Sequence, residues 1–390
     1  MTRTSSSVID LFCGCGGLAA GARAAGYSVV AGVDLEPKYI STFKHNFPEA
    51  VAVDGDLSLI EPKDFAAGLG ITRGQLGLLV GGPPCQGFSK NVPRRARYME
   101  DERNRLVLTF LKYCEYLRPN AVLMENVAEM KNGFDQTYSD EVVDALTAAG
   151  YEVTHAVLNA ADFGVPQRRR RAFFVGVQRR RGVALPRPTH AAEGHGGGLF
   201  ALPSHISVWD AIGDLPPLVH GEGHDILDYS TGPQSAYQEW ARGQSTSVRN
   251  HVSRRLAPIQ YDRLAALEPG QGLKDLPPAL QTKGGYSGAY GRLTKEMIAP
   301  TITRWVFHPG SGRWGHPVDV RTLSIREIAR IQSFPDAFSF VGSYVQQAGQ
   351  LGNAVPPLLA QRILGGIDGN WDRSDLEQFD QVLHGHPVGG

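Results

Sequence analysis

Short runs of apolar and β-branched residues alternate with longer helical patterns over the first half of the chain, from Ser7 to about Val177. The expected strands are 8–12, 28–33, 50–53, 76–80, 121–124, 151–158 and 172–177. The expected helices are 17–25, 38–46, 106–117 and 140–149. Strands that alternate with helices of this length predict an α/β fold with a mostly parallel sheet, covered by helices on both faces.

The pattern changes after about Arg181, where Pro, Gly, His and Ser become frequent and regular periodicity fades as far as roughly Phe307. Such a stretch predicts a smaller domain of irregular structure. Helical patterns return at 324–331 and 356–364, and we expect the second of these to pack back on the first domain. The sequence therefore predicts one domain from 1–186 plus 345–390 and another from 187–344.

The bulk composition is that of an ordinary globular protein, with 42% hydrophobic and 20% charged residues among 390. No stretch approaches the roughly 20 apolar residues that span a bilayer. The polar N-terminus does not resemble a signal peptide, so we expect a cytoplasmic protein without membrane association. The four cysteines fit neither a disulfide framework nor zinc-binding spacing, and no metal site is expected.

The formal net charge is zero, so any nucleic-acid binding depends on where charge is concentrated. Arginines cluster at 94–97, 168–171 and 179–181, while acidic residues gather near the C-terminus. Such runs are also typical of an ordinary solvated face, and alone they do not indicate DNA.

A glycine-rich loop follows the first expected strand, in Asp10-Leu-Phe-Cys-Gly-Cys-Gly-Gly17. Glycines between a strand and a helix allow a tight turn and close approach to a ligand. The spacing is not the Gly-x-Gly-x-x-Gly of dinucleotide sites, but a nucleotide other than S-adenosylmethionine, or a plain turn, stays open from this loop alone. Asp34 suits ribose hydroxyls, and Asp56 could accept a hydrogen bond from an adenine amine.

The fourth expected strand leads into Gly81-Gly-Pro-Pro-Cys-Gln-Gly-Phe-Ser89. Here the sequence resembles the DNA (cytosine-5) methyltransferases of bacterial restriction–modification systems, in which a Pro-Cys-Gln loop follows the fourth strand. The family's other blocks follow in its usual order, namely Asp10–Gly17, Glu125–Val127, Gly164–Arg171, Arg321–Arg330 and Gly352–Pro357. The resemblance covers nearly all the chain except about 182–300. It implies a class I S-adenosylmethionine-dependent methyltransferase fold, Rossmann-like, with a smaller irregular target-recognition domain.

The resemblance implies that Cys85 is the nucleophile. Carbon 5 of cytosine is a poor nucleophile, so a thiolate must first add to carbon 6. That addition pushes electrons to N3, where Glu125 resembles the family's acid; a carboxyl group in a closed pocket can have a raised pKa and donate a proton. Asn126 is expected to orient the acid. The sequence identifies no base for the proton on carbon 5, and water is one alternative.

The Gln-x-Arg-x-Arg pattern of the family maps to Gln167, Arg169 and Arg171. Alternate residues of an extended segment share a face, so Arg169 and Arg171 are expected to point together into the site. Arg169 would contact the base oxygen or the Cys85 region, and Arg171 would pair with Glu125.

S-Adenosylmethionine is the implied cofactor and S-adenosylhomocysteine its product. The residues expected at this cofactor are Phe12, Gly14, Gly16, Gly17, Leu18, Asp34, Leu35, Asp56, Leu57, Gly82, Pro84, Asn353 and Ala354. For Asn353, capping of a helix is an alternative, and both roles could hold.

Double-stranded DNA is the implied partner, and the target base must be rotated out of the stack. Segment 87–105 resembles a mobile loop that closes over it. Contacts with DNA are expected from Gln86, Phe88, Ser89, Lys90, Arg94, Arg95, Arg97 and Arg168. Candidates for major-groove contact in the irregular region are Arg249, Asn250, His251, Arg254, Arg255, Arg292 and Arg304. By resemblance, Arg321 and Glu327 scaffold this domain and are not catalytic.

Two other classes of protein were weighed. A transfer-RNA cytosine methyltransferase would use the same fold and cysteine, but its Cys-Phe-Thr motif is absent from this sequence. A non-catalytic DNA-binding regulator on a decayed scaffold would not need Cys85, Glu125, Arg169 and Arg171, which are all present. The compact size favours a monomer that protects self DNA on the nucleoid, beside a cognate restriction endonuclease or defence system. The DNA sequence that the protein would recognise cannot be predicted from the amino-acid sequence.

Overall fold

The structure is a computed structural model that describes residues 6–84, 105–132, 137–178, 184–192, 202–284 and 287–367. These residues pack as two compact units. The first unit contains the described residues of 6–159, 170–188 and 355–367, and the second unit contains those of 160–169 and 189–354.

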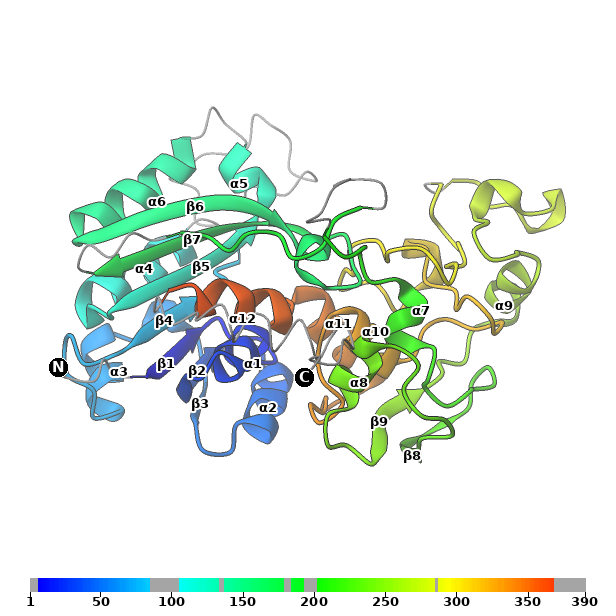
Figure 1. Ribbon diagram of the computed structural model, residues 1–390, viewed down its shortest axis with the longest axis horizontal. Helices are drawn as coiled ribbons and strands as arrows, with labels where there is room; N and C mark the ends of the chain where they lie inside the picture. Colours follow the sequence, from blue (N-terminus) through cyan, green and yellow to red (C-terminus); the bar gives the residue numbers. More distant parts are fainter. Residues whose placement is uncertain are drawn as a thin grey trace, which may run out of the picture. The chain divides into compact units, whose positions relative to one another are not determined.

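The first unit is built on a seven-stranded sheet (Figure 1). Its strands are β1 (Ser7–Leu11), β2 (Ser28–Asp34), β3 (Val51–Asp54), β4 (Leu78–Gly81), β5 (Ala121–Val127), β6 (Tyr151–Asn159) and β7 (Arg170–Gln178). The spatial order is β3-β2-β1-β4-β5-β7-β6; β7 runs antiparallel to both neighbours and the other pairs are parallel. Each of the seven expected strands forms, and the predicted class I methyltransferase fold is confirmed.

Helices cover this sheet, namely α1 (Gly17–Ala24), α2 (Pro37–Asn46), α3 (Pro62–Gly68), α4 (Arg105–Leu117), α5 (Ala128–Asn132), α6 (Thr137–Ala148) and α12 (Pro357–Gly365). In α4 the buried side chains include Phe110, Tyr113, Cys114 and Leu117, which recur at helical spacing and join the core of the unit. The apolar face of α4 therefore fixes it to the sheet.

The C-terminal helix α12 returns to the first unit and packs on α1, as the sequence predicted (Figure 1). The contact is close because position 21 is glycine. A Cβ atom added to Gly21 would lie 2.5 Å from the Cβ of Ala360 and 2.6 Å from the carbonyl oxygen of Pro357. The α12 helix thereby supports the helix that follows the glycine loop.

The second unit contains α7 (Val208–Ile212), α8 (Ala236–Arg242), α9 (Pro258–Ala265), α10 (Ile325–Ile331) and α11 (Tyr344–Asn353). An antiparallel pair, β8 (Gly223–Asp228) and β9 (Ser247–Val252), adds its regular strands. Short 3₁₀ turns lie at Ala160–Phe163, Leu273–Asp275, Pro278–Leu280 and Pro309–Ser311. Of these elements, the sequence predicted only α10.

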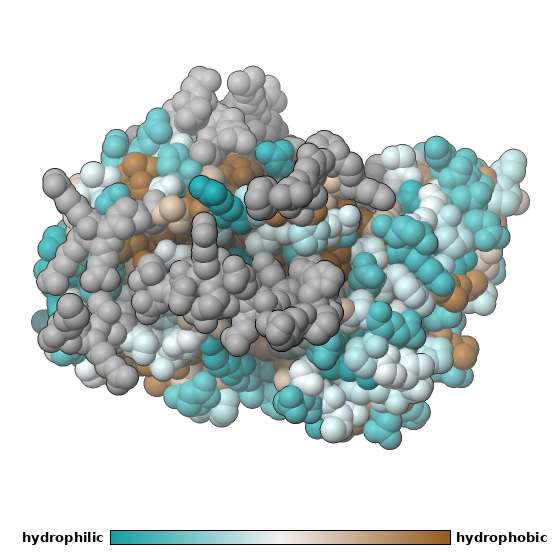
Figure 2. Space-filling model, in the orientation of Figure 1, coloured by the Kyte–Doolittle hydropathy of each residue, from teal (hydrophilic) through white to brown (hydrophobic). Residues whose placement is uncertain are grey.

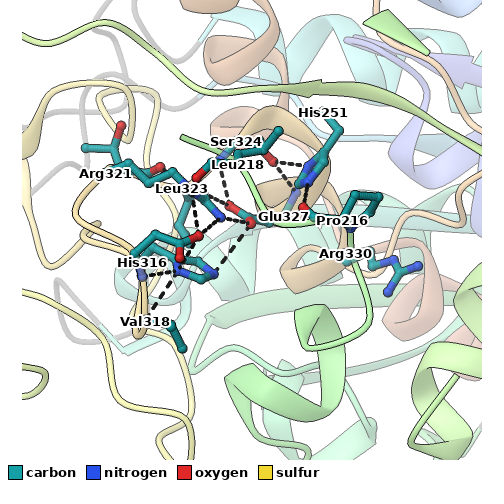
Figure 3. Close-up of polar contacts among 12 residues, drawn as sticks. Pro216, Leu218, His251, His316, Val318, Arg321, Leu323, Ser324, Glu327 and Arg330 are labelled. Atoms are coloured by element: carbon teal, nitrogen blue, oxygen red, sulfur yellow. Dashed lines mark hydrogen bonds and ion pairs between the residues drawn. The ribbon is translucent and has the colours of Figure 1, made fainter. Parts of the chain in front are cut away.

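Buried charges organise the second unit around α10 (Figure 3). Arg321 donates two hydrogen bonds of 2.8 Å to the carboxylate of Glu327, and both side chains are almost fully buried. Glu327 also accepts from the backbone N–H of Ser324, which caps α10. Arg330 pairs with Asp214 and Asp336, all three fully buried. These contacts support the scaffolding role expected for Arg321 and Glu327.

Two histidines complete this cluster as neutral rings (Figure 3). His316 accepts hydrogen bonds at Nδ1 from the backbone N–H groups of Val318 and Asp319, and its Nε2 lies 3.6 Å from Glu327. His251 donates from Nε2 to the carbonyl of Pro216, so its Nδ1 accepts from Ser324. Burial lowers the pKa of His316 to about 4 and also lowers that of His251, although Glu327 opposes both shifts.

On the face that Figure 2 shows, hydrophilic residues cover most of the described surface and hydrophobic residues occur in small separate groups. No helix in the described ranges is long and apolar enough to cross a membrane.

Candidate active site

The predicted site residues of the first unit meet at one edge of the sheet. Leu11, at the end of β1, lies opposite Val33 of β2 and Gly81 of β4, and Gly81 lies opposite Met124 of β5. The residues that follow these positions therefore line the carboxyl edge of the parallel strands, which is where ligands bind in open α/β sheets.

Backbone conformation shapes the glycine loop after β1. Gly14 and Gly16 have φ angles of 55° and 99°, and Phe12 also has a positive φ of 59°. A Cβ on Gly16 would lie 2.6 Å from the ring of Phe47, whereas one on Gly14 would meet nothing within 4 Å. Glycine at 16 is thus required by both packing and backbone, and the side of Gly14 is open for a ligand.

Asp34 fixes this loop from the end of β2. Its carboxylate accepts from the backbone N–H of Gly14 at 2.8 Å and from that of Glu36 at 2.9 Å. Burial raises the pKa of Asp34, while these N–H donors oppose the rise. The residue predicted to bind ribose therefore also holds the loop in shape.

Asp10 has a role that the sequence did not reveal. Its side chain is fully buried and accepts from the backbone N–H of Ala19 at 3.0 Å, in the first turn of α1. Gly16, at the N-cap of α1, offers no side-chain acceptor, so Asp10 replaces it. Burial raises the pKa of Asp10 well above its usual value. In the sequence, the position of Asp10 just before the glycine loop was the signal that could have indicated this role.

Asp56 caps the turn Leu57–Leu59 at the end of β3. One carboxylate oxygen accepts from the backbone N–H and the hydroxyl of Ser58, at 2.9 and 2.7 Å, and these bonds lower the pKa of Asp56. Leu35 is exposed, whereas Leu57 is buried in the core. The remaining cofactor candidates of the first unit, Gly17, Leu18, Gly82 and Pro84, lie in or beside the loops at the same edge.

Asn353 and Ala354 end α11 and fall in the second unit. Asn353 is exposed, and the N-cap of α12 is Pro356. The capping alternative is therefore wrong for α12, and the cofactor role of Asn353 stays a prediction.

Glu125 and Arg171 form the predicted ion pair on adjacent strands. The Nε of Arg171 lies 3.0 Å from Oε1 of Glu125, with side chains that are 20% and 12% exposed. The antiparallel register of β5 and β7 places Val127 opposite Arg171, two residues from the acid. A Cβ on Gly82 would lie 3.3 Å from Oε2 of Glu125, so the acid lies beside the start of the loop that leads to Cys85.

Asn126 connects β5, the strand that carries Glu125, to the loop that leads to Cys85. Its side-chain amide donates to the carbonyl of Pro83 at 3.2 Å, and its amide oxygen accepts from the backbone N–H of Val127. The residue is buried, so these bonds hold the chain two positions before Cys85. Cys85 itself lies outside the described residues, as do Gln86, Phe88, Ser89, Lys90, Arg94, Arg95 and Arg97.

Arg169 does not point to the same partners as Arg171. It is 2% exposed and donates to the carbonyls of Ile302 and Gly352 at 2.9 and 3.2 Å, within the second unit. Gln167 is fully buried there, where it donates to Gln332 and accepts from the N–H of Ile302. The alternation expected for an extended segment is present in the burial, since Arg169 is buried and Arg171 is half-buried whereas Arg168 and Arg170 are exposed. Arg169 precedes β7, which begins at Arg170, and its guanidinium binds backbone groups of the second unit.

Three of the residues expected to contact the major groove are buried, so the expectation is wrong for them. Arg292 is 5% exposed and donates to the carbonyls of Leu267, His316, Val318 and Asp319. Asn250 pairs with the backbone of Phe340, and His251 is fully buried. Their polar groups are used inside the fold. By contrast, Arg168, Arg249, Arg255 and Arg304 are exposed and Arg254 is half-buried.

Comparison with known proteins identifies the class. The chain matches the family of C-5 cytosine-specific DNA methylases over residues 6–368. It is 32% identical to the Type II methyltransferase M.AgeI of Thalassovita gelatinovora, over 90% of this chain and 97% of that protein. It is also 32% identical to M.DdeI of Desulfomicrobium norvegicum, over 95% and 90% of the two chains. A crystal structure of a proposed DNA modification methyltransferase from an E. coli prophage matches with a TM-score of 0.73 and 24% identity, over 93% and 98% of the two chains.

The chain therefore belongs to the C-5 cytosine-specific DNA methylase family. It is a DNA (cytosine-5-)-methyltransferase.

Proposed function

We propose that this enzyme methylates carbon 5 of a cytosine rotated out of duplex DNA, with S-adenosylmethionine as the donor and Cys85 as the nucleophile. The observation that carries the proposal is the Glu125–Arg171 pair beside Gly82, at the sheet edge that also holds the glycine loop. When bound, S-adenosylmethionine supplies a methyl group on a positively charged sulfur and leaves as S-adenosylhomocysteine.

The residues of the glycine loop fit such a donor. The open side of Gly14 lets a ligand approach the backbone, and Asp34 and Asp56 place carboxylates at the ends of β2 and β3. Acceptors at these two positions match the ribose hydroxyls and the exocyclic amine of an adenosine. Exposed Leu35 offers an apolar surface for the base.

Three of the four cysteines are unsuited to nucleophilic attack. Cys13, Cys15 and Cys114 are buried, and burial raises the pKa of each thiol well above its usual value. A buried thiol with a raised pKa is inert because the thiolate is the reactive form. This pattern supports Cys85 as the nucleophile.

In the proposed reaction the thiolate of Cys85 forms a bond to carbon 6. The electron pair of the ring double bond moves toward N3, where Glu125 donates a proton, and carbon 5 becomes nucleophilic. Arg171 stabilises the carboxylate of Glu125 that results, at the distance of 3.0 Å seen between them. After methylation the proton on N3 returns to Glu125. Water or another base then takes the proton from carbon 5, its electron pair restores the double bond between carbons 5 and 6, and the carbon–sulfur bond breaks so that Cys85 regains its electron pair.

Gln167 and Arg169 act in this proposal by holding the segment that precedes β7, because their polar groups bind Ile302, Gln332 and Gly352. The part of the chain in 187–344, which supplies most of the second unit, is proposed to recognise DNA, and the part in 1–186 plus 345–390 is proposed to bind the donor and perform catalysis. Exposed Arg168, Arg249 and Arg255 are suited to phosphate contacts.

The relatives named above are Type II methyltransferases. We therefore propose that the enzyme acts as a cytoplasmic monomer that protects self DNA in a restriction–modification system, beside a cognate endonuclease.

Bisulfite sequencing of DNA from cells that express the protein tests this proposal. Wild type and Cys114→Ala should both methylate cytosines within one short sequence, and Cys85→Ala should methylate none, at equal protein levels. Cys114→Ala controls for loss of a thiol as such. Methylation by Cys85→Ala at the wild-type level would exclude the proposed mechanism, and no methylation by wild type on any sequence would exclude the function.

A further inference from the structure

Trp305 is the most exposed aromatic side chain in the described part of the second unit, at 52%. It is flanked by charge and by a second ring. The guanidinium of Arg304 lies 4.8 Å from the centre of the Trp305 ring, and the Phe307 ring lies 5.7 Å from it. Arg254 lies 5.4 Å from the Phe307 ring. The contacts therefore run from Arg304 to Trp305, Phe307 and Arg254, so two neighbouring aromatic rings lie between two arginines in one cluster.

The backbone under Trp305 is fixed by consecutive turns. The N–H of Val306 donates to the carbonyl of Thr303 at 3.0 Å, and that of His308 donates to the carbonyl of Trp305 at 2.9 Å. The hydroxyl of Ser311 donates to the same Trp305 carbonyl at 2.6 Å. Val306 is buried, so the exposed ring stands next to a residue that anchors the turn.

The residues at the start of this turn make further close contacts within the second unit. Arg169 and Gln167 bind the backbone of Ile302, and a Cβ on Gly352 would lie 2.2 Å from the backbone nitrogen of Arg304. Glycine at 352 thus permits the backbone to approach closely. A side chain presented from so restrained a segment loses little conformational entropy when it binds a partner.

The two arginines have different geometry. Arg254 is half-buried, and it donates to the carbonyl of Phe307 while its guanidinium lies over that ring. Arg304 is exposed, and the ring of Trp305 is the contact that orients its guanidinium. Arg254 is therefore suited to support the cluster, and Arg304 with Trp305 is suited to contact a partner.

The chemistry of this pair matches duplex DNA. A guanidinium can donate two hydrogen bonds to guanine in the major groove, and an apolar ring can contact the methyl group of thymine. The positive charge of Arg304 also complements the phosphate backbone, which favours DNA over an apolar protein partner. Trp and Arg are the residues that most often dominate the energy of an interface.

We propose that Trp305 and Arg304 are specificity-determining residues that contact base edges of the DNA site, with Phe307 and Arg254 as their support. This inference rests on the proposed action of the enzyme on duplex DNA. It assigns sequence reading to a residue, Trp305, that no motif of the sequence indicated.

Selection of bound duplexes from a random pool tests this, because it reads DNA recognition without methylation. Wild type, Trp305→Ala, Trp305→Phe and Tyr261→Ala are each used as the full chain with S-adenosylhomocysteine present. Tyr261 is the matched control, since it is an exposed aromatic of the same unit that stacks on His220 at 4.6 Å. Binding of the selected duplex and of its single-base variants is then measured by fluorescence anisotropy.

Wild type, Tyr261→Ala and, in large part, Trp305→Phe should select one sequence. Trp305→Ala should accept several bases at one or more of its positions and should bind the wild-type sequence about 10- to 100-fold more weakly, the usual loss for one base contact. Its melting temperature should match that of Tyr261→Ala, which separates a lost contact from a damaged fold.

The proposal is overturned if Trp305→Ala selects the wild-type sequence with wild-type affinity. It is also overturned if Trp305→Ala loses the same factor on every duplex together with thermal stability, or if wild type selects no sequence. A wild type that selects a sequence but does not methylate it would overturn the proposed function and leave this inference supported.

Discussion

The substitution Glu327→Gln should strongly destabilise the second unit because it removes a buried negative charge while preserving size. Glu327 is 1% exposed and forms two 2.8 Å hydrogen bonds with Arg321, which is equally buried. Among the residues that the structure describes, Arg321 would keep only Asp319 as an anionic partner, and Asp319 is more exposed. His316 would lose the carboxylate 3.6 Å from its Nε2.

Removal of one partner from a buried ion pair costs about 3–5 kcal/mol of unfolding free energy. For a unit of about 150–250 residues each kcal/mol lowers the melting temperature by about 2–4 °C, so we expect a loss of about 6–20 °C. The expected value lies toward the lower end, since Asp319 still neutralises part of the charge on Arg321.

The loss should depend on pH in a defined direction. Burial raises the pKa of Glu327, but the buried ion pair with Arg321 outweighs it and holds that pKa well below its usual value. The carboxylate therefore contributes its full stability above the ordinary glutamate pKa, and this contribution begins to fall below about pH 4.5 and is lost as pH falls through the lower pKa of the folded state. The difference between wild type and Glu327→Gln should be constant from pH 8 to pH 6 and should shrink toward pH 4.

Urea unfolding followed by circular dichroism at several pH values measures this difference. Glu239→Gln is the control, because Glu239 is an exposed carboxylate of the same unit, and it should change stability by less than about 1 kcal/mol. A Glu327→Gln protein as stable as the control at pH 7 would refute the reasoning, as would a loss that stays undiminished at pH 4.

Three further results are expected. Arg171→Ala should lower the single-turnover rate constant of methylation by about 100-fold or more, because Glu125 loses its ion-pair partner. Arg170→Ala, on the same strand, should leave this rate constant near that of wild type. Arg292→Ala should lower the free energy of unfolding by about 1–3 kcal/mol and leave the salt dependence of DNA binding unchanged. Replacement of the exposed Arg249 by Ala should instead reduce the slope of that salt dependence by about 1 without loss of stability. The opposite pattern would restore Arg292 as a DNA contact. Gly21→Ala should lower the free energy of unfolding by about 1–3 kcal/mol because the added methyl group would overlap Ala360. Gly68→Ala should not, because its methyl group would enter open space. A Gly21→Ala protein as stable as Gly68→Ala would show that α1 and α12 can move apart.

The fold of the first unit could be predicted from the sequence because its central strands, β1 and β4, are buried on both faces. Leu78–Val80 is a continuous apolar run, and the first strand carries three fully buried apolar residues, Val8, Ile9 and Leu11. Helix α4 repeats its buried residues at helical spacing. Helix α3 was missed because it is only one to two turns long and begins with a proline. Within the candidate site, the Glu125–Arg171 pair was predicted from the resemblance to the family, and the adjacent strands β5 and β7 are what bring the two side chains together.

The second unit was predicted poorly because its stability comes from buried polar contacts rather than an apolar pattern. The strand Ser247–Val252 carries Arg249, Asn250 and His251 in succession, which gives no alternation of hydrophobic and polar residues. Asn250 and Arg292 looked like surface groups in the sequence, yet their hydrogen bonds to distant backbone groups bury them. Local sequence contains no signal for partners 90 or 26 positions away.

Covalent capture of the protein by a duplex that carries 5-fluorocytosine at the methylated position tests the central claim most directly. Fluorine replaces the proton that must leave carbon 5, so the bond between sulfur and carbon 6 cannot be released. With S-adenosylmethionine present, wild type should form a complex that survives denaturation, and peptide mapping should place the DNA on Cys85. Absence of this complex on a duplex whose unmodified form is methylated, or attachment through another residue, would contradict the account.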